Sequence, residues 1–147
     1  MATARFFNAT WFIVYARWAQ TPAEAREAMA ALPKYSPLPA SGTSPWDKGH
    51  EGRVRALVGD ADGAVPLLRA AIAWCGGVPD DQEPKAFDST TDAMRDRLLL
   101  GQILEQKGDA AGACEQYGGV LARWGSAKPR SVTDDAARAR SKALGCR

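Results

Sequence analysis

Histidine is almost missing from this chain, because His50 is the only one among its 147 residues. A metal site with several histidines is therefore excluded, and a zinc site of three cysteines with His50 lacks the CxxC spacing of structural zinc sites. The sequence also contains no GxxxxGK[ST] phosphate loop and none of the glycine-loop, His-Arg-Asp or Asp-Phe-Gly motifs of protein kinases. We therefore expect no catalytic activity, no metal and no cofactor.

Cysteine is scarce as well. The three cysteines, Cys75, Cys114 and Cys146, are odd in number and widely spaced. This pattern argues against a disulfide framework and is typical of a reducing cytoplasm, where we expect the protein to reside. Cys114 follows an alanine of an expected helix and is predicted to be a small residue of its packed face.

Long hydrophobic runs are missing too. The most apolar stretch, residues 6–19, is interrupted by polar side chains and is too short to span a bilayer as a helix. It also lacks the charged start and the cleavage site of a secretory signal. The sequence thus predicts no membrane span.

The net charge is only +2, but it is unevenly placed. Residues 123–147 carry a clear excess of basic side chains over Asp134 and Asp135. This segment could contact nucleic acid, an acidic partner or an acidic face of its own domain, or it could be a solvated helix face. Aromatic residues are not interleaved with the charges, which disfavours single-stranded nucleic acid. The basic residues are Arg123, Lys128, Arg130, Arg138, Arg140, Lys142 and Arg147.

What the sequence does contain is a repeated motif. The run Gly-Asp-Ala-x-Gly-Ala occurs at residues 59–64 and again, 49 residues later, at residues 108–113. Each copy lies between two apolar stretches with helical spacing, and abundant alanine with few β-branched residues favours helix. A motif repeated at this distance indicates stacked helical repeats, which present binding surfaces and seldom carry chemistry.

Each copy of the motif predicts the turn of a helical hairpin. The first glycine would adopt positive φ at the turn, and the aspartate would cap the second helix. Two helices that cross closely also need small residues at the crossing, and glycine stands seven positions before each turn glycine and alanine five positions after it. The paired positions are Gly52 and Gly101, Gly59 and Gly108, Asp60 and Asp109, Ala64 and Ala113, and Leu68 and Tyr117.

Helix caps and prolines define the remaining elements. Thr21 and Glu24 form a predicted capping box, and Pro33 is expected to end that helix. A second capping box is predicted at residues 89–92, after an acidic loop at 76–88. We therefore predict one all-α domain over residues 1–147, with a degenerate hairpin at about 4–32, hairpins at 45–75 and 89–125, a capping helix at 131–145, and no strand.

An aromatic stripe marks the first predicted helix. Its members share one face by helical spacing and are expected to lie in the core. The stripe could instead pack on the repeat array, dimerise through Trp11 and Trp18, or lie against a membrane surface. The stripe comprises Phe7, Trp11, Val14, Tyr15 and Trp18.

The hairpin layout resembles the tetratricopeptide repeat over about residues 45–125. The small residue, the turn glycine and the helix alanine of that family are present in both copies, and its aromatic position is Tyr117, with Leu68 in its place in the first copy. The proline that ends the family's repeat is missing, and the 49-residue spacing exceeds the usual ~34 residues. The resemblance implies antiparallel hairpins stacked in a short superhelix that acts as a non-catalytic protein-interaction scaffold.

A narrower resemblance covers residues 98–146. This segment, which ends in the run SKALGC, is similar to the C-terminal repeat region of large bacterial serine/threonine protein kinases, especially those of myxobacteria. The resemblance implies a repeat module related to bacterial signalling proteins, without the kinase domain.

The family resemblance also implies where a protein or peptide partner would bind. In tetratricopeptide proteins the first helix of each pair lines the concave surface. Arg53 and Arg95 could bind a peptide carboxylate there, because the guanidinium group matches its geometry. The clamp of lysine and asparagine known in some members is not reproduced, so C-terminal peptides are not implied. The candidate partner-binding residues are Trp46, His50, Arg53, Arg95, Gln102 and Gln106, with Glu105 beside them.

Overall fold

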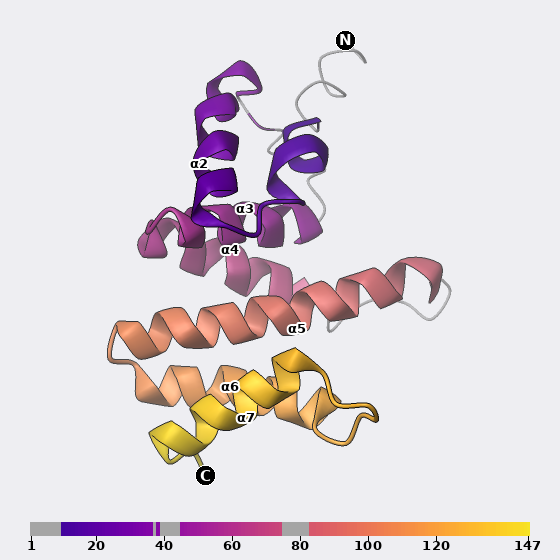
Figure 1. Cartoon of the computed structure of the whole chain (residues 1–147), viewed down its shortest axis with the longest axis vertical. Coiled ribbons are helices and arrows are strands. Elements are labelled where there is room, and N and C mark those ends of the chain that lie inside the picture. Colours follow the sequence, from indigo (N-terminus) through magenta and orange to yellow (C-terminus); the bar gives the residue numbers. More distant parts are fainter. Residues whose placement is uncertain (1–9, 37, 39–44, 75–82) are drawn as a thin grey trace. The chain divides into compact units, whose positions relative to one another are not determined.

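The structure is a computed structural model that describes residues 10–36, 38, 45–74 and 83–147, with the backbone alone at 45, 46, 74 and 83–90. The chain divides into two compact units, Met1–Trp74 and Cys75–Arg147, which are described separately. Over the described residues every regular element is a helix, as predicted (Figure 1). The stacking of the hairpins into one superhelical domain stays a prediction.

The first unit contains a short N-terminal helical layer and one hairpin. A π-helix and α2 precede the hairpin of α3 and α4, and a short 3-10 helix follows α2. The bounds are η1 Phe12–Ala16, α2 Pro22–Ala31, η2 Leu32–Lys34, α3 Pro45–Leu57 and α4 Ala61–Trp74. The second unit contains a hairpin followed by one helix, which lies across α6 in Figure 1. Its bounds are α5 Glu83–Gln106, α6 Ala110–Trp124 and α7 Val132–Leu144.

Both hairpin turns are built as the repeated motif predicts. Gly59 and Gly108 have φ of +87° and +80°. In the second turn the Asp109 N–H donates to the carbonyl of Leu104 at 2.8 Å, and the Gly108 N–H donates to that of Glu105 at 3.0 Å. This is the Schellman pattern, which satisfies the last carbonyls of a helix. In the first turn the two equivalent N–H groups likewise donate to carbonyls that lie five and three residues earlier in the chain.

The aspartates of the motif cap the second helix of each hairpin. The Gly63 N–H donates to Oδ1 of Asp60 at 2.9 Å, and the Gly112 N–H donates to Oδ1 of Asp109 at 2.8 Å. Each of these glycines would place a Cβ against the carboxylate of its aspartate. The fifth residue of the motif is therefore glycine because the capping carboxylate occupies the space of a side chain.

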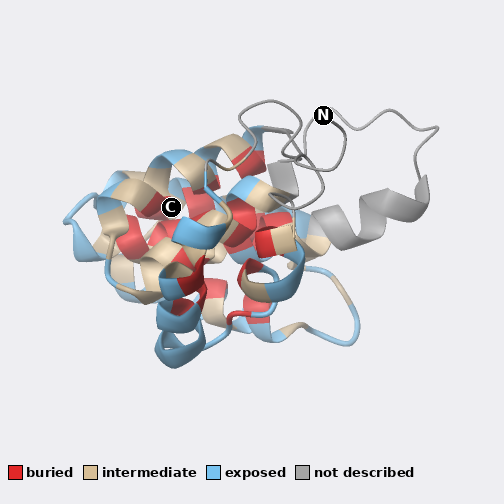
Figure 2. Cartoon of the chain, turned by 90° about the horizontal axis from the view of Figure 1, so that it is seen from above, coloured by how far each residue is buried: buried red, intermediate tan, exposed pale blue. Residues whose placement is uncertain are grey.

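The predicted close crossing of the hairpin helices is also confirmed. A Cβ built on Gly52 would lie 2.9 Å from Cγ of Leu68, and one on Gly101 would lie 2.5 Å from Cε1 of Tyr117. Leu68 and Tyr117 are fully buried. The glycines therefore let the two helices approach until backbone and side chain touch. Figure 2 shows that buried stretches alternate with exposed ones along the helices.

The start of α2 follows the predicted capping box. The Glu24 N–H donates to Oγ1 of Thr21 at 3.3 Å, and the Thr21 N–H donates to Oε2 of Glu24 at 2.9 Å. The N–H of Gln20 also donates to that oxygen, and this bond is the main reason why the pKa of Glu24 is lowered. Helix α2 ends at Ala31, and Pro33 lies in the following 3-10 helix, so the predicted stop is confirmed.

The aromatic stripe is only partly confirmed. The N–H of Arg17 donates to the carbonyl of Phe12 at 2.9 Å, so this segment is a π-helix, in which residues five apart share a side. Trp11 is buried as predicted, but Phe12, which is off the predicted stripe, is buried as well. Tyr15 is partly buried against the core, but Val14 and Trp18 are exposed instead of buried. Phe7 lies outside the described residues.

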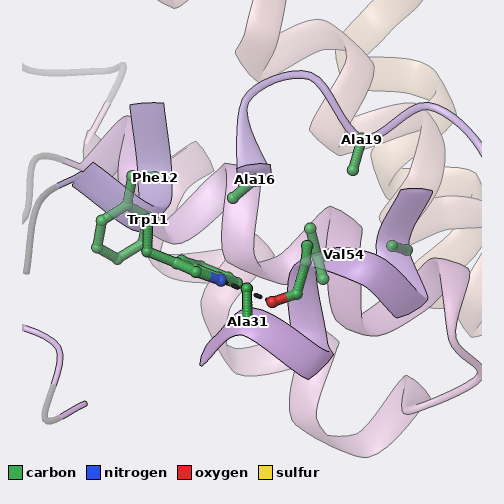
Figure 3. Packing of buried hydrophobic residues seen from close by; sticks show 8 residues of the cluster. Trp11, Phe12, Ala16, Ala19, Ala31 and Val54 are labelled. Carbon is green, nitrogen blue, oxygen red and sulfur yellow. Dashed lines mark hydrogen bonds between the residues drawn. The ribbon is translucent and has the colours of Figure 1, made fainter. Parts of the chain in front are cut away.

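Trp11 is the centre of the first unit's core. Its side chain is fully buried, and its Nε1–H donates to the carbonyl of Ala28 at 2.8 Å (Figure 3). Small residues of η1 and α2 pack around the indole, and Val54 reaches the same cluster from α3. This core therefore joins the N-terminal layer to the first hairpin.

The boundary of α5 is a second correction. The helix begins at Glu83, so residues 89–92 lie inside it, and neither the capping box there nor the loop over 83–88 exists. Pro84 is accepted because proline fits the first turn of a helix, and no further proline or glycine follows until Gly101. Residues 76–82 of the predicted loop lie outside the described residues. The other predicted helices, from residue 45 onward, agree with the structure to within a residue or two.

The cysteines give the third correction. Cys114 of α6 and Cys146, just after α7, form a disulfide with Cα atoms 5.5 Å apart. Gly145 has φ of +67°, and the Cys146 N–H donates back to the carbonyl of Ser141 at 3.0 Å. This turn brings Cys146 to α6, which the sequence spacing does not reveal. Cys114 is half-buried and covalently bonded, and not the simple core residue expected.

Candidate interaction surfaces

Helix α3 exposes less of its predicted binding face than expected. His50 is buried, with 8% of its surface exposed, and Arg53 is half-buried. The side chain of Trp46 lies outside the described residues. Of the three α3 candidates, none is described as an exposed side chain.

Helix α5 presents its candidates to solvent. The side chain of Arg95 is 57% exposed, Gln106 is exposed and Gln102 is half-buried. Spacings of seven and four residues put the three on one face of the helix. Arg95 makes a long ion pair of 4.0 Å with Asp92 on its own helix, which leaves its guanidinium group available to a carboxylate. These three residues are called the α5 stripe below.

Glu105, next to the α5 stripe, has an internal role that the sequence did not reveal. Its Oε2 accepts a hydrogen bond of 2.8 Å from the hydroxyl of Tyr117 on α6, and its Oε1 accepts one of 3.3 Å from Arg140 on α7. Burial and the Glu105 carboxylate together raise the pKa of the Tyr117 hydroxyl well above its usual value. Glu105 therefore links three helices and is not free for a partner.

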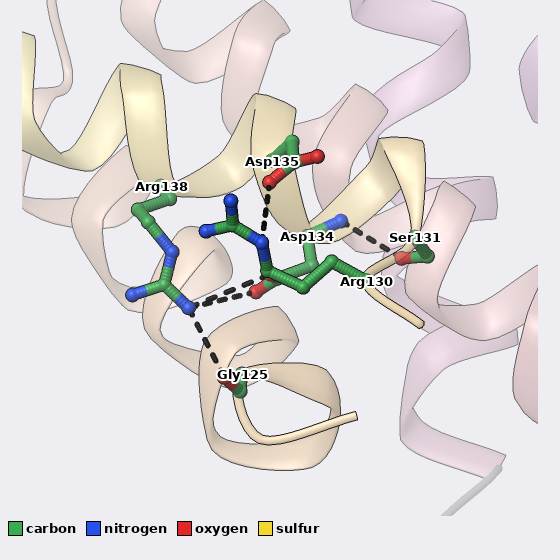
Figure 4. Close-up of polar contacts among 6 residues, drawn as sticks. All are labelled: Gly125, Arg130, Ser131, Asp134, Asp135 and Arg138. Carbon is green, nitrogen blue, oxygen red and sulfur yellow. Dashed lines mark hydrogen bonds and ion pairs between the residues drawn. The ribbon is translucent and has the colours of Figure 1, made fainter. Parts of the chain in front are cut away.

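The basic C-terminal segment is partly neutralised within its own unit. Arg138 lies 3.3 Å from the fully buried carboxylate of Asp134 and donates to the carbonyl of Gly125 at 3.2 Å (Figure 4). Arg130 pairs with Asp135 at 3.4 Å. Arg140 pairs with Glu105 of α5, so one described ion pair of the segment reaches another helix of the unit, while the other two are internal to the segment. Four others are exposed side chains: Arg123, Lys128, Lys142 and Arg147.

Three exposed apolar residues lie in and just after η1 and are called the η1 patch below. Ile13 is 58%, Val14 52% and Trp18 65% exposed, and the guanidinium of Arg17 lies 5.5 Å from the centre of the Trp18 ring. Trp11 is fully buried, so the predicted dimer contact through Trp11 is wrong. A contact through this face would use the three exposed apolar residues.

The first hairpin carries a polar clamp at its turn. Arg55 donates to Oε1 of Glu51 and to Oδ2 of Asp60, both at 2.9 Å. The hydrogen bond from the Gly63 N–H, followed by that from Arg55, lowers the pKa of Asp60. The equivalent of Arg55 in the second hairpin is Leu104, so the two turns share a backbone design but differ in side-chain support.

The described residues hold no cluster of three or more side chains suited to a metal ion. The expectation of no metal and no cofactor stays a prediction. Among the helices that the structure describes, none combines the length and the hydropathy needed to cross a membrane. Compared with models of known protein families, with curated proteins and with solved structures, the chain matches none.

Proposed function

We propose that this protein is a non-catalytic protein-interaction scaffold made of tetratricopeptide-type hairpins. The observation that carries the proposal is the repetition of one hairpin design, with the same positive-φ glycine, capping aspartate and glycine-on-large-residue crossing in both hairpins. A chain that repeats such a unit gains an extended helical surface, which is the usual basis of partner binding in repeat proteins.

The α5 stripe is the proposed contact with the partner. Arg95 supplies an exposed guanidinium group, which binds carboxylates with two parallel hydrogen bonds, and the two glutamines can donate to and accept from a peptide backbone. The partner expected from this chemistry is a protein segment with an acidic side chain. His50 and Arg53 of α3 are buried or half-buried and are not part of the proposed contact.

Affinity capture with surface variants tests this proposal. Wild-type protein and an Arg95→Glu/Gln106→Ala variant are used to capture proteins from a lysate of the source cells, and mass spectrometry identifies them. Arg123→Glu is the matched control, because Arg123 is an exposed arginine on α6 and not on the stripe. Circular dichroism establishes that all three proteins are folded.

A protein retained by wild type and by Arg123→Glu, but lost from the stripe variant, supports the proposal. Equal retention by all three would exclude the α5 stripe as the binding site. The η1 patch would then be the next surface to test. If no protein is retained by the wild type, the scaffold function itself loses its support.

The cellular setting is part of the proposal. From the resemblance proposed for residues 98–146, we also propose a role related to bacterial serine/threonine kinase signalling, without a kinase domain in this chain. The predicted cytoplasmic location rested on unpaired cysteines, and the Cys114–Cys146 disulfide removes that basis. Disulfides persist mainly in oxidising compartments, which favours a location outside the cytoplasm or a regulated bond.

Binding of nucleic acid or an acidic partner through the basic segment is the second candidate function. It depends on the four exposed basic side chains of residues 123–147 that make no described ion pair. Retention on immobilised duplex DNA at low salt, lost steeply as salt rises, would support it. Lack of retention at low salt would eliminate nucleic acid.

A further inference from the structure

Helix α7 buries little apolar surface. Its buried residues are Thr133, Asp134 and Ala137, which are small or charged, and Val132 is 86% exposed. Leu144, its largest apolar residue toward the C-terminus, is only half-buried. Because burial of apolar surface is the main force that holds helices together, packing alone gives α7 a weak hold on α6.

Polar contacts add little to this hold. From α7, Arg138 reaches the carbonyl of Gly125 and Arg140 reaches Glu105, but both arginine side chains are about half exposed. The ion pair of Arg138 with the fully buried carboxylate of Asp134 lies within α7 itself. Ion pairs in such positions are screened by water and salt and stabilise weakly. The covalent attachment of α7 to α6 is at its C-terminal end, in the bond between Cys146 and Cys114.

We propose that the Cys114–Cys146 disulfide is a redox latch that keeps α7 docked on α6, and that its reduction releases α7. The reductant is a dithiol: its thiolate attacks one sulfur of the disulfide, the sulfur–sulfur bond breaks, and the second thiol of the reductant resolves the mixed disulfide. The reductant becomes a cyclic disulfide, and Cys114 and Cys146 each take up a proton as thiols. Neither cysteine is fully buried.

The hairpin of α5 and α6 is stabilised by contacts that do not involve α7. Helices α5 and α6 meet at the contact of Gly101 with Tyr117, and Leu100 and Val120 are fully buried near the same crossing. Their turn is closed by backbone bonds that do not involve α7. Reduction therefore frees one helix without unfolding its unit, and it uncovers the surfaces of α6 and α5 on which α7 packs. The inference goes beyond the scaffold function and does not depend on it.

Hydrogen exchange with mass spectrometry tests the latch. The protein carries Cys75→Ser, so that no third thiol can exchange with the pair, and is compared after air oxidation and after treatment with dithiothreitol. We expect exchange of the α7 amides to accelerate on the order of 100-fold after reduction, as expected for loss of a constraint on a closed loop. The amides of α5 and α6 should keep their protection.

Two further measurements make the result decisive. Alkylation in denaturant, read by mass, should find no free thiol in the oxidised Cys75→Ser protein and two after reduction. A Cys75→Ser/Cys114→Ser/Cys146→Ser variant should show fast α7 exchange with and without dithiothreitol. Two free thiols in the air-oxidised protein, unchanged α7 exchange on reduction, or equal loss of protection in α5, α6 and α7 would each overturn the proposal.

Discussion

Gly101 of α5 and Tyr117 of α6 touch where their helices cross: a Cβ on the glycine would lie 2.5 Å from Cε1 of the ring. Tyr117 is fully buried, and its hydroxyl is fixed on Glu105, so the ring cannot swing away without breaking a hydrogen bond. The crossing distance of this hairpin is therefore set by the absence of one methyl group.

Gly101→Ala should lower the free energy of unfolding by about 1–3 kcal/mol, because the added methyl group overpacks the crossing. Gly118→Ala is the matched control, since Gly118 lies within α6 and a Cβ there meets nothing within 4 Å. The control should be more stable than wild type by roughly 0.5–1 kcal/mol, because alanine favours helix over glycine. Urea unfolding of the three proteins measures both effects, and equal stabilisation by both substitutions would refute the close crossing.

A substitution at a turn glycine should be tolerated only as far as the new residue can adopt positive φ. Gly108→Val is expected to destabilise by about 1–2 kcal/mol, since a β-branched residue is strained at a φ of +80°. Gly108→Asn should lose less, because asparagine adopts this conformation more readily than other residues with a side chain. Thermal unfolding midpoints should follow the order glycine, asparagine, valine, and a valine variant as stable as wild type would argue against the turn.

The same change should destabilise the protein at one tryptophan of the N-terminal layer and have little effect at the other. Trp11→Phe removes the Nε1–H that donates to the Ala28 carbonyl and leaves part of the fully buried indole's space empty, and the lost bond and packing should destabilise the protein by about 1–3 kcal/mol. Trp18→Phe changes an exposed ring and should alter stability by less than about 0.5 kcal/mol. Chemical unfolding distinguishes them, and equal effects would contradict the burial of Trp11.

The lowered pKa of Asp60 predicts that the first hairpin loses part of its stability in acid. The Gly63 N–H and then Arg55 lower its pKa, so its contribution to stability is fully present above its ordinary pKa and is lost as pH falls through the lowered one. Asp60→Asn keeps a good helix cap without the charge. The variant should be less stable than wild type at neutral pH, and the difference should shrink toward pH ~3, near the ordinary carboxyl range. A constant difference across thermal unfolding curves at several pH values would contradict this assignment.

The hairpins could be predicted because their determinants are local. The positive φ of Gly59 and Gly108 and the caps at Asp60 and Asp109 depend on residues within one turn of the chain. The capping box at Thr21 was readable for the same reason. Such positions carry their structure in their own backbone and hydrogen-bonding chemistry, whatever packs around them.

The predictions that were wrong concern features that depend on contacts between residues far apart in the sequence. Trp18 is exposed, while Trp11 donates to the Ala28 carbonyl, a contact across 17 residues that periodicity does not contain. The disulfide joins Cys114 to Cys146 across 32 residues, through the turn at Gly145. The binding face was projected from helix register alone, and register does not show that His50 is buried or that Glu105 is held by Tyr117 and Arg140.

The turn motif has a consequence for protein engineering. The bonds described for it, from the carbonyl of Leu104 to the N–H of Gly112, lie within nine consecutive residues. One short segment thus holds the hydrogen bonds that end one helix and start the next. It should work as a transplantable connector: inserted between two designed helices, it would reverse the chain, while a glycine and a bulky residue at matching positions would set the spacing of the helices.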